Sequence, residues 1–253
     1  MGKVIAIANQ KGGVGKTTTA VNLGAGLSQL GKKVLVLDTD PQGNTTSGLG
    51  VDKKKVANSL YDAIINGVPL EDIILPTELE NLFLAPATMD LAGAEIELVP
   101  ALSRETKLKQ ALEQVREEYD FLVIDCPPSL GLLTVNALTA ADSILVPIQC
   151  EFYALEGLTQ LMNTVHLVQS HLNPALKIEG VVLTMFDSRT NLSTQVAQEV
   201  KRFFREKVYR TVIPRNIRLS EAPSHGQPII VYDPKSKGAE VYMALAEEVA
   251  RSA

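Results

Sequence analysis

The sequence is most informative near its start, where residues 4–18 read Val4-Ile5-Ala6-Ile7-Ala8-Asn9-Gln10-Lys11-Gly12-Gly13-Val14-Gly15-Lys16-Thr17-Thr18. The apolar residues 4–8 are typical of a buried strand, and the glycines after them are typical of a tight loop. A helix is expected from Lys16 onward. Strand, loop and helix in this order are the parts of the βα units from which parallel sheets are built.

The glycine-rich loop has the features of a phosphate-binding loop. Gly12, Gly13 and Gly15 can adopt backbone angles that turn N–H groups inward, and they let a phosphate approach closely. The helix that follows directs the positive end of its dipole at the same place. Lys16 supplies a cation for the β- and γ-phosphates of a nucleotide, and the Thr17 hydroxyl is a suitable ligand for Mg²⁺.

Two residues of this loop depart from the common pattern G-x-x-x-x-G-K-[ST]. Gln10 stands where the first glycine belongs, and Lys11 adds a second lysine five residues before Lys16. Lys11 cannot easily reach the same phosphates from the same side as Lys16. Two interpretations of Lys11 are open: it reaches a phosphate held by another subunit, or it is a solvated lysine on a turn.

Two acidic positions are expected beside the loop. Asp125 ends the apolar run 121–124, and the segment Asp38-Thr39-Asp40-Pro41-Gln42-Gly43-Asn44 follows a second apolar run. Ligands of open α/β sheets bind at the carboxyl ends of strands, so Asp125 suits a Walker-B role that orients a Mg²⁺-bound water. Asp40 is a candidate to position or activate an attacking water, or else an aspartate that forms a turn or caps a helix.

Apolar runs alternate with helix-like stretches along the rest of the chain. Strands are expected at residues 3–8, 33–38, 82–85, 121–125, 143–148, 178–184 and 208–212. Helices are expected at residues 16–30, 59–66, 104–119, 132–140, 155–172, 192–207 and 239–251. Continuous rather than alternating apolar runs favour strands covered on both faces. We therefore predict an α/β fold, a mostly parallel twisted sheet flanked by helices on both faces, in one domain over residues 1–253. Residues 48–100 carry the weakest signals for helix or strand, and we expect them at the edge of the sheet.

Composition excludes several classes of protein. With 45% hydrophobic and 21% charged residues, the chain should fold into a globule with a sizeable core. Two cysteines, Cys126 and Cys150, cannot form a disulfide scaffold, and their spacing does not suggest zinc. The apolar runs are too short for a membrane span, and the N-terminus has no signal-peptide pattern. A cytoplasmic location is expected.

The charge is unevenly distributed. The net charge is −5, but residues 201–218 carry seven cations against one acid, Glu206, so that segment is +6 and the remainder −11. The cations are Lys201, Arg202, Arg205, Lys207, Arg210, Arg215 and Arg218. Such a segment can hold a phosphate backbone in a salt-dependent way. Aromatic residues are only 5% and Trp is absent, which disfavours recognition of single strands by base stacking.

Four motifs together resemble one family. Residues 11–18 resemble the deviant Walker A motif of the ParA/MinD P-loop ATPases. Residues 38–44, 125–129 (Asp-Cys-Pro-Pro-Ser) and 214–224 (Pro-Arg-Asn-Ile-Arg-Leu-Ser-Glu-Ala-Pro-Ser) resemble its chromosome-partitioning branch, ParA/Soj. The resemblance runs from the first strand to the last helix.

The resemblance implies a homodimer that forms with ATP and Mg²⁺ and holds two nucleotides at its interface. Lys11 would contact the partner's phosphate, Lys16 its own, Thr17 would bind Mg²⁺, and Asp40 would be critical for hydrolysis. The implied catalytic residues are Lys11, Lys16, Asp40 and Asp125, and the implied metal ligands are Thr17, Asp40 and Asp125. The implied nucleotide contacts are Lys11, Gly12, Gly13, Val14, Gly15, Lys16, Thr17 and Thr18, with Pro214, Arg215 and Asn216 near the adenine.

The resemblance also implies partners for this dimer. It should bind double-stranded DNA non-specifically through Arg189 and Arg218, associate with the nucleoid, and be stimulated to hydrolyse ATP by a ParB/Spo0J-type protein. Membrane binding is not expected, because residues 240–253 are acidic and read as a packing helix rather than a basic amphipathic one.

Four alternatives compete with the partitioning interpretation. A MinD-like membrane ATPase is disfavoured by the acidic C-terminal residues. A metal-carrier or redox ATPase would need a second suitably placed cysteine besides Cys126. A GTPase would need an Asn-Lys-x-Asp element, which the chain lacks. A biosynthetic P-loop ligase or kinase would need a substrate pocket, which sequence alone does not exclude.

Overall fold

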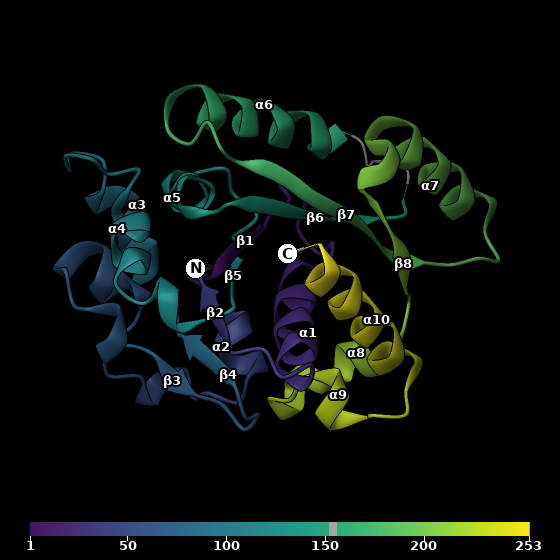
Figure 1. Cartoon of the computed structure of the whole chain (residues 1–253), viewed down its shortest axis with the longest axis horizontal. Helices are drawn as coiled ribbons and strands as arrows, with labels where there is room; N and C mark the ends of the chain where they lie inside the picture. The colour runs from purple at the N-terminus through teal and green to yellow at the C-terminus, as the bar shows by residue number, and fades with distance from the viewer. Residues whose placement is uncertain (152–155, 253) are drawn as a thin grey trace.

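The computed structural model describes residues 1–151 and 156–252. At its centre lies a sheet with the strand order β3-β4-β2-β5-β1-β6-β7-β8 (Figure 1). The strands are β1 Lys3–Ile7, β2 Val34–Asp38, β3 Leu75–Pro76, β4 Leu82–Ala85, β5 Phe121–Asp125, β6 Ser143–Gln149, β7 Lys177–Phe186 and β8 Val208–Pro214. Within the described residues every pairing is parallel except that of β3 with β4.

Helices cover both faces of the sheet (Figure 1). The helices are α1 Lys16–Gln29, α2 Asn44–Gly48, α3 Leu91–Glu97, α4 Lys107–Glu113, α5 Leu132–Ala140, α6 Glu156–His171, α7 Asn191–Phe204, α8 Ile217–Glu221, α9 Ile229–Tyr232 and α10 Lys237–Arg251. Side chains of α3 to α7 form one apolar cluster with one face of the sheet, and those of α1 and α8 to α10 form the other. Both faces are therefore dry, which explains the continuous apolar runs.

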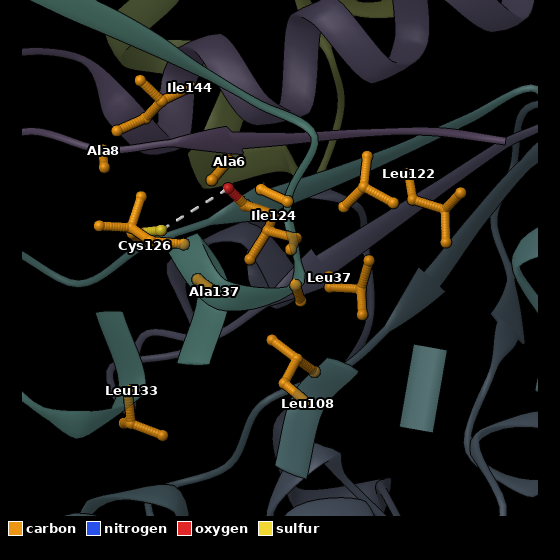
Figure 2. Packing of buried hydrophobic residues seen from close by; sticks show 14 of the residues in the cluster. Ala6, Ala8, Leu37, Leu108, Leu122, Ile124, Cys126, Leu133, Ala137 and Ile144 are labelled. Carbon is orange, nitrogen blue, oxygen red and sulfur yellow. Dashed lines mark hydrogen bonds between the residues drawn. The ribbon is translucent and has the colours of Figure 1, made fainter. Parts of the chain in front are cut away.

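The central strands are buried along almost their whole length. All residues of β2 and β5 are buried, and β1 is buried apart from the partly exposed Lys3. Figure 2 shows how Ile124 and Ala6 of neighbouring strands share one face with Ala137 of α5. Close packing there leaves the polar groups of these strands no access to water except at their ends. Any buried polar side chain in this sheet is therefore expected at a strand terminus.

The predicted α/β fold is confirmed, and most predicted elements lie where they were expected. β4, β5 and α5 match the predicted bounds, and the other strands differ by a few residues at their ends. α6 is described from Glu156, and the predicted start of this helix at Leu155 lies outside the described residues. Residues 48–100, whose sequence signals are weak, include β3 and β4. These two strands lie at one edge of the sheet, as expected.

The prediction of one helix over residues 104–119 is wrong. Here α4 ends at Glu113 and a separate 3₁₀ turn, Arg116–Glu118, follows. The Arg116 guanidinium donates to the carbonyl of Gly2 at 2.8 Å, and the Arg116 carbonyl accepts from the Gly2 N–H at 3.2 Å. These contacts with the start of the chain override the helical pattern.

Both edges of the sheet are closed to further strands. On one side β3 is only two residues long, and Pro76 has no N–H to donate. On the other side the carboxylate of Glu248, from α10, accepts hydrogen bonds from the backbone N–H groups of Arg210 and Thr211 at 3.0 and 2.8 Å. Two of the N–H groups of β8 are thus bound by a side chain of the same chain, which hinders the addition of a further strand there.

Helix α1 approaches the sheet unusually closely at Gly24. A Cβ placed there would lie 2.6 Å from the Val36 Cγ2 atom of β2 and 3.4 Å from the Leu82 Cδ1 atom of β4. Neither β-strand neighbour has room to withdraw in a close-packed layer. The position of α1, and with it the loop before it, thus depends on glycine at this point.

We predict that Gly24→Ala lowers the free energy of unfolding by about 1 kcal/mol. The overpacking cost of about 1–3 kcal/mol should exceed the gain of about 1 kcal/mol from better helix propensity. Equilibrium denaturation in urea measures the difference. Gln29→Ala, at the exposed end of the same helix, is the control and should be neutral or stabilising. A stabilised Gly24→Ala protein would contradict the close approach.

Candidate active site

The loop between β1 and α1 is shaped to receive an anion. Gly13 and Gly15 have φ of 74° and 88°, a region in which a side chain would be strained. The N-cap of α1 is Gly15, so no side chain caps the N–H groups of the first turn. Thr184 of β7 fixes the loop by donating from its hydroxyl to the Val14 carbonyl at 2.8 Å. Uncapped N–H groups at the start of a 14-residue helix fit a polyphosphate.

Lys16 is held inside the site rather than in solvent. Its side chain is only 7% exposed, and its Nζ donates to the Lys11 carbonyl at 3.2 Å. Burial lowers the pKa of Lys16, and attraction to Asp125 opposes that effect. Burial of an ammonium group is costly, and a neutral carbonyl offsets only part of that cost. An anionic acceptor such as a phosphate would bind the Lys16 ammonium more strongly. The position agrees with the predicted phosphate contact.

Asp125 lies at the end of β5 and is fully buried. Its Oδ2 accepts hydrogen bonds from the hydroxyls of Thr17 at 2.8 Å and Thr45 at 2.7 Å. Its Oδ1 is also buried but has no hydrogen-bond partner among the described residues. An unpaired buried carboxylate oxygen next to the Thr17 hydroxyl fits a Mg²⁺ ion with its water, because Mg²⁺ takes oxygen ligands and shares them with phosphates.

Asp38 is a second buried carboxylate, directly beside the first. It pairs with Asp125 in the register of β2 and β5, and both residues are 0% exposed. Its Oδ2 accepts from the backbone N–H and the hydroxyl of Thr46, both at 2.7 Å. Burial raises the pKa of Asp38 to about 6 and that of Asp125 to about 7, and repulsion between the two adds to the rise at Asp125.

Asp40 lies in the loop after β2, two residues beyond Asp38. Its Oδ1 accepts from the Gln42 N–H at 2.9 Å, and its carbonyl accepts from the Gly43 N–H at 2.8 Å. Asp40 thus forms a turn, which leaves open whether it also positions a water. No hydrogen bond within the described residues reaches its Oδ2 atom, and the side chain is partly exposed. The loop that carries it follows β2, at the same sheet edge as Asp38 and Asp125.

The Lys11 side chain lies near Glu151, which follows β6. Its Nζ lies 3.8 Å from the Oε2 atom of Glu151, whose Oε1 also lies 3.3 Å from Arg215 Nη2. Gln149 Nε2 donates to the same Oε1 at 2.6 Å. Glu151 therefore joins Lys11 to the loop after β8. Both interpretations of Lys11 stay open, since the Lys11 and Glu151 side chains are partly exposed.

A cavity of about 320 Å³ opens next to the phosphate loop. It is lined by Gly15 and Thr18 together with Pro214, Arg215 and Asn216, and by apolar side chains of α8 and α10. A cavity of this size and character is typical of small-molecule sites. The structure thus brings the predicted adenine-contacting residues to the phosphate loop, although they are about 200 residues apart in the sequence.

The two predicted DNA contacts lie at the carboxyl ends of neighbouring strands, Arg189 after β7 and Arg218 after β8. Arg189 makes a bidentate pair with Asp187 at 2.9 and 2.7 Å. Arg218 lies 2.9 Å from Glu221 and 3.5 Å from Asp233. Both guanidinium groups are more than half exposed. They are accessible, but each is paired with an acid of its own chain.

The cations of residues 201–218 are divided between the two edges of the sheet. Strand β8 occupies Val208–Pro214 and crosses the sheet from its amino to its carboxyl edge. At about 3.3 Å per residue, the strand separates the two ends by roughly 20 Å. Lys201 to Lys207 therefore lie at the amino edge, whereas Arg215 and Arg218 lie at the carboxyl edge with the phosphate loop.

The cysteines do not support a redox or metal-carrier role. Cys126 and Cys150 are 1% and 2% exposed, and both are free thiols. Burial raises the pKa of both, that of Cys150 to about 11, so neither forms a thiolate readily. In the parts of the chain that the structure describes, no group of three or more His, Cys, Asp or Glu side chains is arranged to hold a metal ion.

The C-terminal helix is the packing helix that was predicted. Val241, Tyr242, Leu245, Ala246 and Val249 of α10 are buried against α1 and the sheet. Among residues 1–151 and 156–252, no helix has the length and apolar character needed to cross a membrane.

Sequence reasoning missed three residues of the site: Asp38, Thr45 and Glu151. Asp38 ends a run of four apolar residues in the same way as Asp125, so a signal was present. Thr45 had no signal, because its contact with Asp125 arises only when α2 folds back over the end of β5. Glu151 follows β6 by two residues, but no spacing connects it to Lys11 or Arg215.

We predict that the ligand-free protein loses stability as the pH rises through the titration of the buried pair. Folding raises both carboxyl pKa values above their unfolded value of about 4, so the folded state holds more protons. This contribution is fully present below about pH 4 and is lost as the pH approaches about 7. Asp125→Asn should therefore raise the free energy of unfolding at pH 8, by roughly 2 kcal/mol, and change it little at pH 5.

Urea denaturation at pH 5 and pH 8 without nucleotide measures this difference. The control is Glu113→Gln on the exposed side of α4, which removes a carboxylate without changing the pH dependence. An Asp125→Asn protein that is less stable at pH 8 than the unchanged chain would show that the buried pair does not titrate in this way.

Comparison with known proteins identifies one family. Residues 2–178 match the family model described as an AAA domain. The chain is 67% identical over 250 residues to the sporulation initiation inhibitor protein Soj of Bacillus subtilis, covering 99% of both chains. It is 55% identical to the chromosome partitioning protein ParA of Myxococcus xanthus, over 98% of this chain and 88% of that protein.

Solved structures show the same fold. A cobyrinic acid a,c-diamide synthase from Mycobacterium smegmatis with bound ADP and magnesium has a TM-score of 0.87 at 41% identity, covering 99% of this chain and 95% of that chain. The cell division ATPase MinD of Pyrococcus furiosus has a TM-score of 0.82 at 30% identity, covering 100% of both. The Soj and ParA proteins share far more of the sequence than these two structures and extend over nearly the whole chain. This chain belongs to the Soj/ParA family of chromosome-partitioning ATPases.

Proposed function

We propose that this chain is a switch that dimerises with ATP, binds DNA non-specifically as the ATP dimer, and serves in the partitioning of a chromosome or plasmid. Hydrolysis, stimulated by a ParB/Spo0J-type protein, would return it to monomers. The observation that carries the proposal is the buried, unpaired Oδ1 of Asp125 beside the Thr17 hydroxyl and the uncapped start of α1. We place the protein in the cytoplasm, on the nucleoid.

ATP and Mg²⁺ would occupy the carboxyl edge of the sheet. The backbone of Gly12 to Thr18 would surround the phosphates, with the Lys16 ammonium against the β- and γ-phosphates. Thr17 and Asp125 would hold Mg²⁺, which neutralises phosphate charge when bound. Pro214, Arg215 and Asn216 would contact the adenine in the adjoining cavity. Sequence reasoning also assigned Asp40 to the metal, but its position on a partly exposed turn favours a contact with water.

Lys11 would act in the dimer and not within its own chain. The Lys11 ammonium lies 3.8 Å from the Glu151 carboxylate, whereas the Lys16 ammonium donates to the Lys11 carbonyl. The pair is partly exposed, so it contributes little to stability and can be exchanged for a stronger partner. A γ-phosphate presented by a second protomer would be such a partner. Release of that phosphate then removes a contact that holds the dimer together, which couples hydrolysis to dissociation.

Asp40 would orient the attacking water. Its Oδ1 is occupied by the turn, while no hydrogen bond within the described residues uses its Oδ2. Phosphoryl transfer depends chiefly on alignment and charge neutralisation, so one correctly placed carboxylate oxygen is sufficient for this role.

The biosynthetic and MinD-like alternatives are less well supported. The synthase and MinD structures are 41% and 30% identical to this chain, against 67% for Soj. The exposed face of α10 carries Glu240 and Glu247, which does not fit binding to an anionic membrane.

We predict that Asp40→Ala accumulates an ATP-bound dimer. Turnover should fall by about 100-fold because the water is no longer oriented, while phosphate contacts remain. Sedimentation in ATP should show dimers that persist, in contrast to the unchanged chain. Lys16→Ala is the opposite control, because loss of the phosphate cation should abolish nucleotide binding and dimers alike. Normal turnover by Asp40→Ala, or unchanged ATP affinity of Lys16→Ala in calorimetry, would contradict the assigned roles.

We predict that Arg189→Ala and Arg218→Ala each lose retention on duplex DNA in ATP while still dimerising. Each change removes two phosphate contacts from a dimer, so the slope of log affinity against log salt should become shallower by about 2. Retention on duplex DNA at several salt concentrations, compared among ATP, ADP and no nucleotide, measures the effect. Equal retention in ATP and ADP by the unchanged chain would refute the ATP-dependent switch itself.

A further inference from the structure

Two glycines, Gly50 and Gly226, bring α2 into contact with a segment that lines the cavity beside the phosphate loop. This cavity-lining segment comprises α8, the 3₁₀ turn Ala222–His225 and Gly226, so it covers residues 217–226. Three of its side chains line the cavity: Leu219, Ser220 and Pro223. Gly226 caps the turn, and Gly50 follows the last residue of α2 by two positions. The contact therefore connects the wall of the cavity with the helix beside the carboxylate pair.

Neither glycine has room for a side chain at this contact. A Cβ on Gly226 would lie 2.8 Å from the Gly50 Cα atom and 3.3 Å from the Ser47 carbonyl oxygen. A Cβ on Gly50 would lie 3.1 Å from the Gly226 carbonyl oxygen. These neighbours are all backbone atoms, so no change of side-chain rotamer could relieve a clash. The Gly50–Gly226 contact is thus a direct contact between two stretches of backbone.

α2 holds the two buried carboxylates in place. Thr45 donates from its hydroxyl to Asp125 Oδ2 at 2.7 Å. Thr46 donates from its N–H and from its hydroxyl to Asp38 Oδ2, both at 2.7 Å. Both threonines are fully buried, so water cannot easily take over these hydrogen bonds. A displacement of α2 would therefore leave both carboxylates less firmly oriented.

α2 needs support from the rest of the chain, because it is only five residues long. A helix of this length is not stable without contacts to other elements. A second cavity, of about 330 Å³, lies between α2 and the cavity-lining segment and is lined by Ser47 and Ser224 among others. The two elements do not pack closely across this cavity. The Gly50–Gly226 contact is therefore where the segment supports α2 directly.

The cavity-lining segment is anchored on its other side. Leu219 and Ala222 are buried in the apolar cluster that includes α1 and α10. Three residues beyond Gly226, the Ile229 N–H donates to the Asn22 Oδ1 atom of α1 at 2.7 Å, and this hydrogen bond is buried. An added Cβ at the contact would thus displace the short α2 more readily than the segment.

We propose that the Gly50–Gly226 contact positions α2 against the carboxylate pair and thereby sets the affinity of the site for Mg²⁺. The first half concerns the folded chain alone, whereas the second half rests on the proposed nucleotide site. The two glycines touch neither carboxylate and act through Thr45 and Thr46, so they are positioning residues. Contacts that orient metal-binding groups from outside commonly contribute about 10–100-fold to metal affinity. The contact also ties the part of the site that would hold the base to the part that would hold the metal.

Gly226→Ala tests the position of α2 without any nucleotide. The Thr46 amide should exchange with solvent at least about tenfold faster, because the added Cβ moves α2 and weakens the hydrogen bond to Asp38. Amides in the middle of β5 report the global stability, and the change at Thr46 should exceed any change there. Native-state hydrogen exchange followed by NMR measures both.

Gly67→Ala is the matched control. Gly67 also caps a short helical turn and has φ and ψ of 69° and 24°, close to the 64° and 29° of Gly226. A Cβ on Gly67 would meet no atom of the described residues within 4 Å. The control therefore introduces the same backbone strain without the contact, and the Thr46 amide should keep its exchange rate.

The effect on the metal is measured by calorimetric titration of ADP with and without Mg²⁺. In the Gly226→Ala protein, the factor by which Mg²⁺ strengthens ADP binding should fall by about tenfold. The ADP affinity without Mg²⁺ should stay nearly unchanged, because the phosphate loop and the cavity keep their own contacts. Gly50→Ala should show a smaller loss, since its Cβ would lie 3.1 Å rather than 2.8 Å from the nearest atom. It also provides the test if Gly226→Ala does not fold.

Three results would overturn the proposal. The first is an unchanged exchange rate of the Thr46 amide in Gly226→Ala. The second is equal acceleration in Gly67→Ala, which would assign the effect to backbone strain. The third is an ADP affinity that falls equally with and without Mg²⁺, which would place the damage in the cavity.

The two parts of the experiment fail separately. If the unchanged chain bound no ADP, or bound it without any effect of Mg²⁺, the proposed nucleotide site would be wrong. The exchange of the Thr46 amide would still decide whether the Gly50–Gly226 contact positions α2, because that measurement uses no ligand.

Discussion

The site depends on two carboxylates buried side by side at the ends of β2 and β5. Asp38 and Asp125 are opposite each other in the register of the sheet, and neither is exposed to solvent. Two like charges in such a place are unfavourable unless a proton or a cation is present. Thr17, Thr45 and Thr46 supply hydrogen bonds that offset part of this cost and place the phosphate-loop helix and α2 against the same pair. The arrangement therefore favours a cation at the strand ends.

Much of the fold could be predicted from the sequence because its signals are local. The apolar runs are continuous because both faces of the sheet are covered, and the glycine loop with Lys16 and Thr17 needs only a strand before it and a helix after it. Asp125 was found on the same grounds. The helix predicted over residues 104–119 failed because Arg116 binds the start of the chain, a contact that no local pattern contains.

The site was less predictable where it depends on distant segments. Thr45 reaches Asp125 only because α2 turns back, and Glu151 reaches Lys11 and Arg215 only because β6 and β8 end at the same edge. A count of basic residues along the chain could not show where they lie, since it ignores a strand that crosses the sheet. Residues 201–207 and residues 215–218 are close in the sequence but lie at opposite ends of β8.

The closed margins of the sheet matter for a chain in a family whose members we expect to self-associate. A strand edge with free N–H and C=O groups can form hydrogen bonds with the same edge of another copy. Repeated pairing of this kind produces very stable fibrils. Here Pro76 blocks one margin, and the Glu248 carboxylate occupies the donors of the other. These features hinder copies of this chain from joining edge to edge into a continuous sheet, so self-association is directed to other surfaces.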